Sequence, residues 1–257
     1  MTPEPRSVLV HEHDGVLTIT INRARKRNAV DREVAEGISA GLDLLDERPD
    51  LRVGILTGAG SDFCAGLDLA AFARGESARS ATRGFAGIVE RPPVKPLIGA
   101  AEGWAVGGGL EILLCCDLIV AARSARFGLP EVTRGLVARG GGAFRITRRL
   151  PRARAMEMLL TGEPMTAEEA HHFGLVNRIA PEGESLRVAT ELACVIAANA
   201  PLAVAASKRV TLESEHWPPD ELFARQADIL QPVFDSADAR EGALAFTERR
   251  PPRWSGA

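Results

Sequence analysis

The sequence predicts an α/β protein whose C-terminal part is mostly helical. Between residues 16 and 121, four short segments rich in β-branched or other apolar residues are separated by glycine turns and by stretches with helical spacing. Beyond about residue 150 the apolar residues recur mainly at helical spacing. Strands that alternate with helices, followed by helices alone, indicate an α/β core over residues 1–195 and a helical C-terminal region over residues 196–257.

Each expected element follows from a local signal in the chain. Asp31 is a typical N-cap, because Val34 and Ile38 follow it at helical spacing. Thr166 and Glu169 have the spacing of a capping box, which marks another helix start. The expected strands are Val16–Ile21, Val53–Thr57, Pro96–Ala100 and Leu118–Ala121, and two further helices are expected at Leu186–Ala198 and Leu202–Ser214.

The composition is typical of a soluble globular protein. Hydrophobic residues make up 46% and charged residues 25% of the 257 residues, and the formal net charge is −3. Such a balance creates no field that would attract nucleic acid or a membrane surface, and the apolar stretches end well before the roughly 18 residues of a membrane span. The N-terminus lacks the layout of a signal peptide, and the four cysteines have neither zinc-site spacing nor the pattern of a disulfide framework. We therefore expect a cytoplasmic protein with no metal site, no nucleic-acid partner and no membrane partner.

Two glycine-bearing segments, Gly58–Leu69 and Gly103–Gly109, each follow an expected strand. Glycine lets backbone N–H groups approach a ligand closely, and a helix start leaves such groups unpaired. Both segments therefore suit an oxyanion or a phosphate, although the alternative is that the glycines serve only tight packing. A dinucleotide site, and with it a nicotinamide dehydrogenase, is disfavoured because Phe63 stands where the third glycine of that fingerprint belongs.

Two carboxylates are candidates for acid–base chemistry. Glu111 closely follows Gly107–Gly109 within an apolar segment, and burying an ionised carboxylate is costly unless it is paired or hydrogen-bonded. The alternative interpretation is that Glu111 complements the dipole at a helix start. Glu131, at the end of Phe127–Glu131, has the alternative of a solvated loop acid. Each residue taken alone favours the simpler interpretation.

The order and separation of these segments resemble the crotonase family, the enoyl-CoA hydratases and isomerases. The resemblance covers nearly the whole chain. The matching segments are Asn22–Arg23 with Arg27–Ala29, Phe63–Leu69, Gly103–Glu111, Ala125–Glu131, Leu150–Arg152, Gly174–Asn177 and Glu241–Phe246. The resemblance implies a spiral core of repeated β-β-α turns and a helical C-terminal region that forms a homotrimer, often a dimer of trimers.

By this resemblance the chain acts on an acyl-CoA thioester. The backbone N–H groups of Leu67 and Gly108 would form an oxyanion hole for the thioester carbonyl, and Glu111 and Glu131 would flank the reacting double bond. Hydration of a conjugated enoyl thioester needs both a base and an acid, so the presence of both glutamates favours hydration or its reverse. No cofactor is implied, since coenzyme A is part of the substrate.

The resemblance also implies which residues bind the CoA ester. Arg25, Lys26 and Arg27 are expected near its phosphates, with a merely solvated basic loop as the alternative. Residues of the C-terminal segment are expected to reach the nucleotide of a neighbouring subunit, whereas Lys208 is expected in a helix that could be purely structural. The full set of expected binding residues is Arg25, Lys26, Arg27, Ala65, Asp68, Leu69, Phe246 and Arg249.

Two features depart from the pattern of many hydratases. Leu67 stands where hydratases of short acyl chains often carry alanine, and residues 135–145 differ from their GGTQRL-type segment. That segment borders the acyl pocket in the family, so the role of Arg139–Phe144 and the acyl chain length stay open. The leading hypothesis is hydration of 2-enoyl-CoA to 3-hydroxyacyl-CoA. The alternatives are an enoyl-CoA isomerase and an acyl-CoA-binding protein without turnover.

Overall fold

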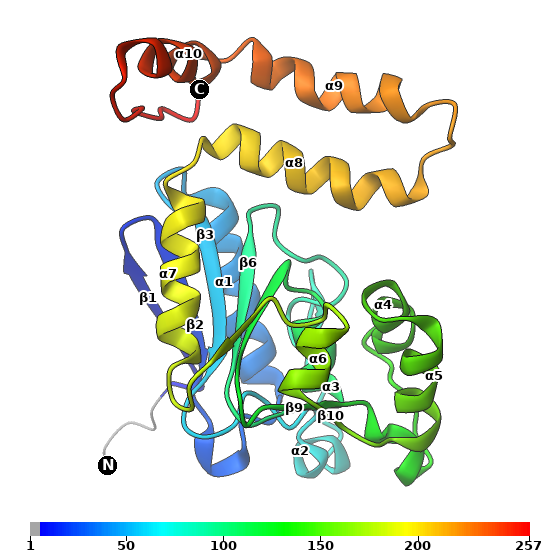
Figure 1. Ribbon diagram of the computed structural model, residues 1–257. Coiled ribbons are helices and arrows are strands. Elements are labelled where there is room, and N and C mark those ends of the chain that lie inside the picture. Colours follow the sequence, from blue (N-terminus) through cyan, green and yellow to red (C-terminus); the bar gives the residue numbers. More distant parts are fainter. Residues whose placement is uncertain (1–5) are drawn as a thin grey trace.

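Two sheets form the core of this computed structural model, which describes residues 6–257 (Figure 1). Residues 1–5, on which the expected lack of a signal peptide partly rests, lie outside the described residues. Neighbouring strands of the larger sheet are parallel, except the first pair. In spatial order they are β1 (Val8–His13), β2 (Val16–Ile21), β3 (Val53–Gly58), β6 (Leu97–Ala101), β8 (Leu118–Ala122) and β11 (Arg178–Ala180). The four strands expected from the sequence are therefore confirmed, with ends that differ by at most one residue.

After each of the strands β3, β6 and β8, the chain leaves the larger sheet and enters a smaller one. Its strands are β10 (Met165–Thr166), β9 (Arg126–Gly128) and β7 (Trp104–Val106), in that spatial order. β6 leads into β7 and helix α3 (Gly108–Leu113), and β8 leads into β9. A bridge between Cys64 and Ala105 adds the segment after β3 to the same sheet. The chain thus winds as a spiral that brings the segments after β3, β6 and β8 side by side.

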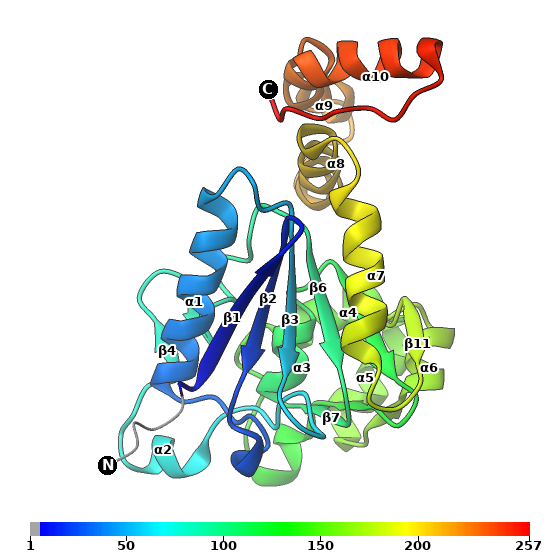
Figure 2. The ribbon, with the colours of Figure 1, turned by 90° about the vertical axis from the view of Figure 1, so that its left-hand side faces the viewer.

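Both faces of the larger sheet are buried at its inner strands β3, β6 and β8, which is why these strands read as continuous apolar runs. Helix α1 (Arg32–Glu47) covers one face and helix α7 (Ser185–Ala197) covers the other (Figure 2). Successive residues of β3 point to opposite sides. Leu56 packs in the cluster that includes residues of α1, whereas Ile55 packs with Ala189 and Ala193 of α7.

The helix caps expected in the core are present, and the other core helices are short. Asp31 accepts a hydrogen bond from the N–H of Val34 at the start of α1. Thr166 and Glu169 form a reciprocal capping box at the start of α6 (Ala167–His172). The remaining elements of the core are α2 (Leu69–Ala73), α4 (Gly142–Arg149), α5 (Arg152–Thr161), the 3-10 helices η1 (Ala24–Lys26) and η2 (Pro130–Arg134), and the hairpin of β4 (Arg79–Ser80) with β5 (Gly84–Phe85).

The last three helices extend away from the core (Figure 1). They are α8 (Pro201–Glu213), which continues into the 3-10 helix η3 (Ser214–His216), α9 (Leu222–Phe234) and α10 (Ala237–Glu248). The two helices expected after residue 185 are therefore confirmed as α7 and α8. Because α7 packs on the sheet, the core continues to Ala197, slightly beyond the boundary expected at residue 195.

No single helix within residues 6–257 is long and apolar enough to cross a membrane. The stretches Ser185–Ala197 and Pro201–His216 would reach that length and composition together, but they are bent by 107° at the break between them. All four cysteines are free.

Lys208 attaches α8 to the core. Its ammonium donates to the carbonyls of Pro93 (2.8 Å) and Lys95 (2.9 Å) and to Oδ2 of Asp117 (2.7 Å). The same Oδ2 accepts the N–H of Leu97 at the start of β6 (2.8 Å). An ammonium has three donors, and all three are used inside the protein. The structural interpretation of Lys208 follows from these contacts.

We expect Lys208→Met to lower the free energy of unfolding by about 1.5–3 kcal/mol, because hydrogen bonds to a charged group are lost and Asp117 loses its counter-ion. Urea unfolding measures the change. The control, Arg209→Met, removes an exposed ion pair with Glu213 from the same helix and should cost at most about 1 kcal/mol. A Lys208→Met variant as stable as the parent would contradict this role.

Candidate active site

The segment after β3 turns so that one backbone N–H is left free. Gly66 has a φ of +87°, which glycine adopts without strain, and its N–H donates to the sulfur of Cys64 (3.3 Å). The N–H of Asp68 donates to the carbonyl of Val30 (2.9 Å). Between these two, the N–H of Leu67 has no acceptor among residues 6–257.

The start of α3 presents a second free N–H, close to the first. Gly108 is the first residue of α3, so its N–H has no acceptor within the helix, and none is found elsewhere in the described part of the chain. The two turns touch because neither carries a side chain. A Cβ on Gly66 would lie 2.9 Å from the nitrogen of Gly108, and a Cβ on Gly108 would lie 3.3 Å from the Cα of Gly66. The structure therefore brings together the two amides that the crotonase resemblance assigns to an oxyanion hole.

An aromatic ring that sequence reasoning missed lies beside this pair. A Cβ on Gly108 would lie 2.6 Å from Cζ of Phe85, so the ring rests on the glycine that carries the free N–H. An apolar neighbour lowers the local dielectric, which strengthens the hydrogen bonds that these N–H groups can give to an oxyanion.

Glu111 is buried in the first turn of α3, where 4% of the residue is exposed. Its Oε1 accepts the N–H of Gly142 (2.8 Å), the first residue of α4. A Cβ on Gly140 would lie 2.6 Å from Oε2 of Glu111, so only a turn without side chains can approach this closely. The segment whose role the sequence left open thus holds Glu111. The three consecutive glycines 140–142 were the signal that could have indicated this contact.

The surroundings of Glu111 shift its proton affinity. Burial raises the pKa of the Glu111 carboxyl above its usual range. The Gly142 hydrogen bond opposes that rise because it favours the ionised form, and the nearby charge of Glu131 adds to it. Glu111 and Glu131 therefore interact electrostatically.

Glu131 lies on η2, three residues after the end of the short strand β9. A Cβ on Gly107 would lie 3.3 Å from Oε1 of Glu131, so this carboxylate adjoins the turn that leads into α3. Its Oε2 is buried and has no hydrogen-bond partner among residues 6–257, and burial raises the pKa of the group. The interpretation as a solvated loop acid is therefore wrong.

The two carboxylates and the two free N–H groups share the turn at Gly107 and Gly108. Free N–H groups on adjoining turns can bind an oxygen on which negative charge develops. Carboxyls with raised pKa values can exchange protons with neighbouring atoms near neutral pH. The arrangement suits acid–base chemistry next to a carbonyl group.

The expected basic loop lies beside the first glycine segment. Arg25 and Lys26 belong to η1 and Arg27 follows it, and all three are exposed. The N–H of Ala65 donates to the carbonyl of Arg27 (2.9 Å), which ties this loop to the turn that presents Leu67. Lys26 pairs with Asp68 (3.3 Å) and Arg27 with Asp62 (3.7 Å), whereas Arg25 has no ion-pair partner among residues 6–257.

Asp68 and Leu69 have different surroundings. The carboxylate of Asp68 is buried, accepts the N–H of Ala71 (3.0 Å) at the start of α2, and pairs with Arg23 (3.0 Å) and Lys26 (3.3 Å). Its contacts hold the loop in shape, and a direct contact with CoA stays a prediction. Leu69 is exposed and Ala65 half-buried, so both are accessible from solvent.

Phe246 and Arg249 lie far from these elements. Phe246 belongs to α10 and Arg249 caps it; both are exposed, at the opposite end of the molecule from α2 (Figure 1). The chain does not bring them to its own glutamates. Their contact with the nucleotide of a neighbouring subunit stays a prediction.

Comparisons with known proteins agree with this geometry. The family model described as enoyl-CoA hydratase/isomerase matches residues 11–257. The chain belongs to this family. It is 42% identical over 253 residues to the enoyl-CoA hydratase EchA19 of Mycobacterium tuberculosis, covering 96% of this chain and 95% of that protein. It is 41% identical over 249 residues to the carnitinyl-CoA dehydratase of Proteus mirabilis, covering 94% and 95% of the two chains.

Solved structures of this family confirm the expected crotonase fold. The crystal structure of enoyl-CoA hydratase EchA1 from Mycobacterium marinum superposes with a TM-score of 0.97 at 54% identity, covering 98% of this chain and 100% of that one. An enoyl-CoA hydratase from Mycobacterium tuberculosis H37Rv superposes with the same TM-score of 0.97 at 55% identity, covering 98% and 100%.

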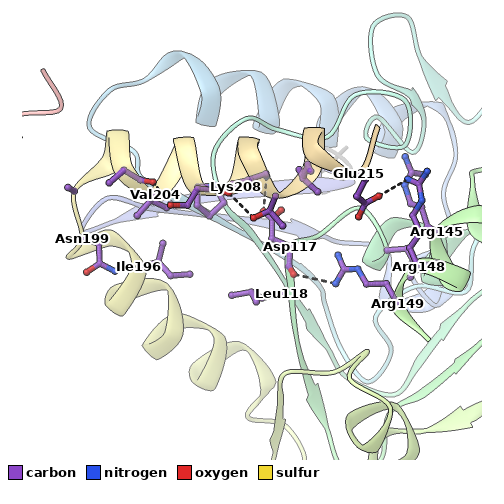
Figure 3. Close-up of a pocket in the computed structure, with 17 residues that line it drawn as sticks. Asp117, Leu118, Arg145, Arg148, Arg149, Ile196, Asn199, Val204, Lys208 and Glu215 are labelled. Carbon is purple, nitrogen blue, oxygen red and sulfur yellow. Dashed lines mark hydrogen bonds and ion pairs between the residues drawn. The ribbon is translucent and has the colours of Figure 1, made fainter. Parts of the chain in front are cut away.

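A pocket of about 770 Å³ in this enoyl-CoA hydratase/isomerase family member lies between α8 and the core, and neither Glu111 nor Glu131 lines it (Figure 3). Its cations are already engaged. Arg149 donates to the carbonyl of Cys116 (2.6 Å), and Lys208 binds the groups described above. We therefore assign the chemistry to the glutamates and not to this pocket.

The raised pKa of Glu111 predicts a pH-dependent stability difference between Glu111→Gln and the parent. Below its ordinary value of 4.5 the carboxyl is protonated in both the folded and the unfolded chain. As the pH rises through the raised pKa, ionisation favours the unfolded chain, so the unfolding free energy of the parent falls. Glu111→Gln has no carboxyl at this position, so its unfolding free energy does not fall in this way. Its stability relative to the parent should increase from pH 4 to pH 7, by about 1.4 kcal/mol for each unit by which the pKa is raised.

Urea unfolding at a series of pH values measures that difference. Glu168→Gln, which removes an exposed carboxylate from α6, shows what the loss of any one negative charge does. The measured quantity is the difference in unfolding free energy between Glu111→Gln and the parent. If it stays constant with pH, or matches the difference for Glu168→Gln, the folded protein does not disfavour ionisation of Glu111.

Proposed function

We propose that this chain reversibly hydrates 2-enoyl-CoA to 3-hydroxyacyl-CoA. The observation that carries the proposal is the pair of carboxyls with raised pKa values, Glu111 and Glu131, beside the free N–H groups of Leu67 and Gly108. Two relatives support it, since one is named a hydratase and the other a dehydratase, the two directions of one type of reaction.

In this mechanism the thioester carbonyl oxygen accepts hydrogen bonds from the N–H groups of Leu67 and Gly108. When water adds to Cβ, the electrons of the double bond move through Cα onto that oxygen. The two donors then stabilise the enolate more strongly than the neutral substrate, which accelerates the reaction. Loss of one such donor typically costs about 10²–10³ in turnover.

The two carboxyls divide the proton transfers. Glu111 is the base, because the Gly142 N–H stabilises its ionised form, and it takes a proton from water as the oxygen bonds to Cβ. Glu131 is the acid, and it gives its proton to Cα as the enolate returns to the thioester. Proton exchange with solvent then restores both groups, so the net change is the addition of one water.

Coenzyme A enters as part of the substrate, and no other cofactor is proposed. Arg25, Lys26 and Arg27 neutralise its phosphates, a task for which exposed cations need no fixed geometry. Ala65 and Leu69 contact the ester between this loop and the turn at Gly66. Cytoplasmic residence remains a prediction from the sequence.

We expect Glu111→Gln and Glu131→Gln each to lower the hydration rate by about 10²–10⁴, the usual worth of a positioned acid or base. Glutamine is nearly isosteric with glutamate but cannot exchange a proton as a carboxyl does. The double variant should lose less than the product of the two single losses, because the residues act as a unit. Mass spectrometry of a panel of enoyl-CoA esters measures the reaction, since hydration adds one water.

The same variants separate the alternatives. An isomerase leaves the substrate mass unchanged and would depend on Glu131 while tolerating Glu111→Gln. CoA ester binding should survive in all variants, because neither acid is proposed to hold the nucleotide. If neither single change slows any enoyl-CoA reaction, the catalytic proposal is wrong and a binding protein without turnover replaces it.

We propose further that the chain assembles as a homotrimer or a dimer of trimers through its last three helices. No residue of α9 is buried within the chain, and Phe223 and Phe234 on it are 85% and 72% exposed. A helix with such side chains gains by burial against another subunit. In such an assembly Phe246 and Arg249 approach a neighbour's nucleotide.

The double change Phe223→Asp with Phe234→Asp should convert the assembly to monomers, because each carboxylate would have to be buried at the interface. Sedimentation velocity measures this against three or six copies of the 27.4 kDa chain. Leu160→Asp, on the exposed face of α5, is the control for a new surface charge. A parent protein that is a stable, active monomer would disprove the assembly.

A further inference from the structure

The guanidinium of Arg145 binds backbone carbonyls instead of a carboxylate. Arg145 lies on α4 and is half-buried. Its Nη1 donates to the carbonyl of Gly140 (3.0 Å) and its Nη2 to the carbonyl of Val89 (2.6 Å). Within residues 6–257, no carboxylate lies within ion-pair distance of it. The positive charge of Arg145 is thus not neutralised by an ion pair.

One of these two carbonyls belongs to the turn that holds Glu111. The turn Gly140–Gly142 donates the Gly142 N–H to Oε1 of Glu111 and packs against Oε2 at Gly140. The ring of Phe144 stacks on the same guanidinium, 5.0 Å from its carbon, and so limits where Arg145 can move. The position of the Glu111 carboxylate therefore depends on a turn that Arg145 fixes.

The other carbonyl belongs to the segment that covers the oxyanion-hole turn. The N–H of Val89 donates to the carbonyl of Phe85 (3.3 Å), so the two residues lie on one tight turn. Phe85 in turn places its ring against Gly108. One guanidinium thus connects the turn behind Glu111 to the segment that packs on Gly108. A lysine at this position would present one ammonium in place of the two nitrogens that bind these carbonyls, so it would not reproduce the same geometry.

We infer that Arg145 is a positioning residue that holds the Glu111 carboxylate in place against the oxyanion hole. The inference rests on the proposed function. Arg145 touches neither the reacting atoms nor the nucleotide, and it acts through the two backbone segments that it clamps.

The charge of Arg145 also affects the pKa of Glu111, and the direction of this effect can be measured. The charged and titratable groups that face Glu111 are Glu131 from η2, Arg145 from α4 and Cys115 from the turn that follows α3. The charge of Arg145 lowers the pKa of Glu111, against the rise caused by burial and by Glu131. Removal of Arg145 should therefore make Glu111 harder to ionise as well as less well placed.

The test compares Arg145→Met, Arg145→Lys and Arg148→Met. We expect Arg145→Met to lower kcat for hydration by about 10–100-fold with little change in KM, because a misplaced carboxylate slows chemistry more than binding. The acidic limb of the kcat/KM profile should move to higher pH, since Glu111 must be ionised to act. Arg145→Lys keeps the charge, so its acidic limb should lie at the same pH as that of the parent. Its kcat should be higher than that of Arg145→Met but lower than that of the parent. Arg148→Met removes a half-exposed charge from the same helix and should stay within about twofold of the parent, as expected for a surface change.

A second measurement does not depend on activity. The stability difference between the parent and Glu111→Gln, followed against pH, reports the proton affinity of Glu111. In the Arg145→Met background that difference should keep growing to a higher pH and reach a larger final value than in the parent, because the folded-state pKa of Glu111 is raised further while its unfolded-state value is unchanged. If this shift occurs but the parent hydrates no enoyl-CoA ester, the proposed function fails and the effect of Arg145 on Glu111 stands.

Two results would overturn the inference. One is an Arg145→Met protein with the parent's rate and pH profile. The other is a slower protein whose acidic limb and stability difference do not move, because a purely structural residue would behave in this way. If Arg145→Met does not fold, Arg145→Gln replaces it, because glutamine removes the charge but can still donate to a carbonyl. Its acidic limb must move to higher pH, and a limb at the parent's pH rejects the inference.

Discussion

A carboxylate buried at the start of an apolar helix constrains much of this structure. Glu111 loses most of its hydration, which is costly for an ionised group unless other contacts replace the water. Its replacement is the N–H of Gly142 in the first turn of α4, where the helix dipole also favours negative charge. That contact requires a turn without side chains. The glycine turn, α4 and the arginine that clamps them are therefore all tied to one carboxylate.

The spiral provides the adjacency that the rest of the site needs. β3, β6 and β8 are neighbours in the larger sheet, and the segments that follow them pair again through Cys64, Ala105 and Phe127. Each segment then adds its part of the site: the first adds the Leu67 amide, the second adds the Gly108 amide and Glu111, and the third adds Glu131. These groups are far apart in the sequence and meet because each occupies the same point in successive turns of the spiral.

The sequence predicted the parts of the fold whose signals are local. The inner strands of the larger sheet are continuous apolar runs with clear ends. Asp31 was recognisable as an N-cap because aspartate is a residue type that commonly caps helices. β1 was missed because it is an edge strand with mostly exposed side chains, and β7, β9 and β10 are too short to show a period. Glu111 and Glu131 became candidates only through the order of motifs along the chain. Arg145 could not be predicted, because its role depends on contacts with turns up to 56 residues away.

Helix α4 is the point at which the glutamate site and the C-terminal helices meet. Its first turn binds Glu111, while its last turn contacts the elements that carry α8 (Figure 3). Arg148 pairs with Glu215 of η3 (3.5 Å), and Arg149 donates to the carbonyl of Asp117 (3.3 Å), whose side chain binds the ammonium on α8. A helix of eight residues has little freedom to bend between these ends. The same short helix therefore contacts Glu111 at its first turn and the groups that hold α8 at its last turn.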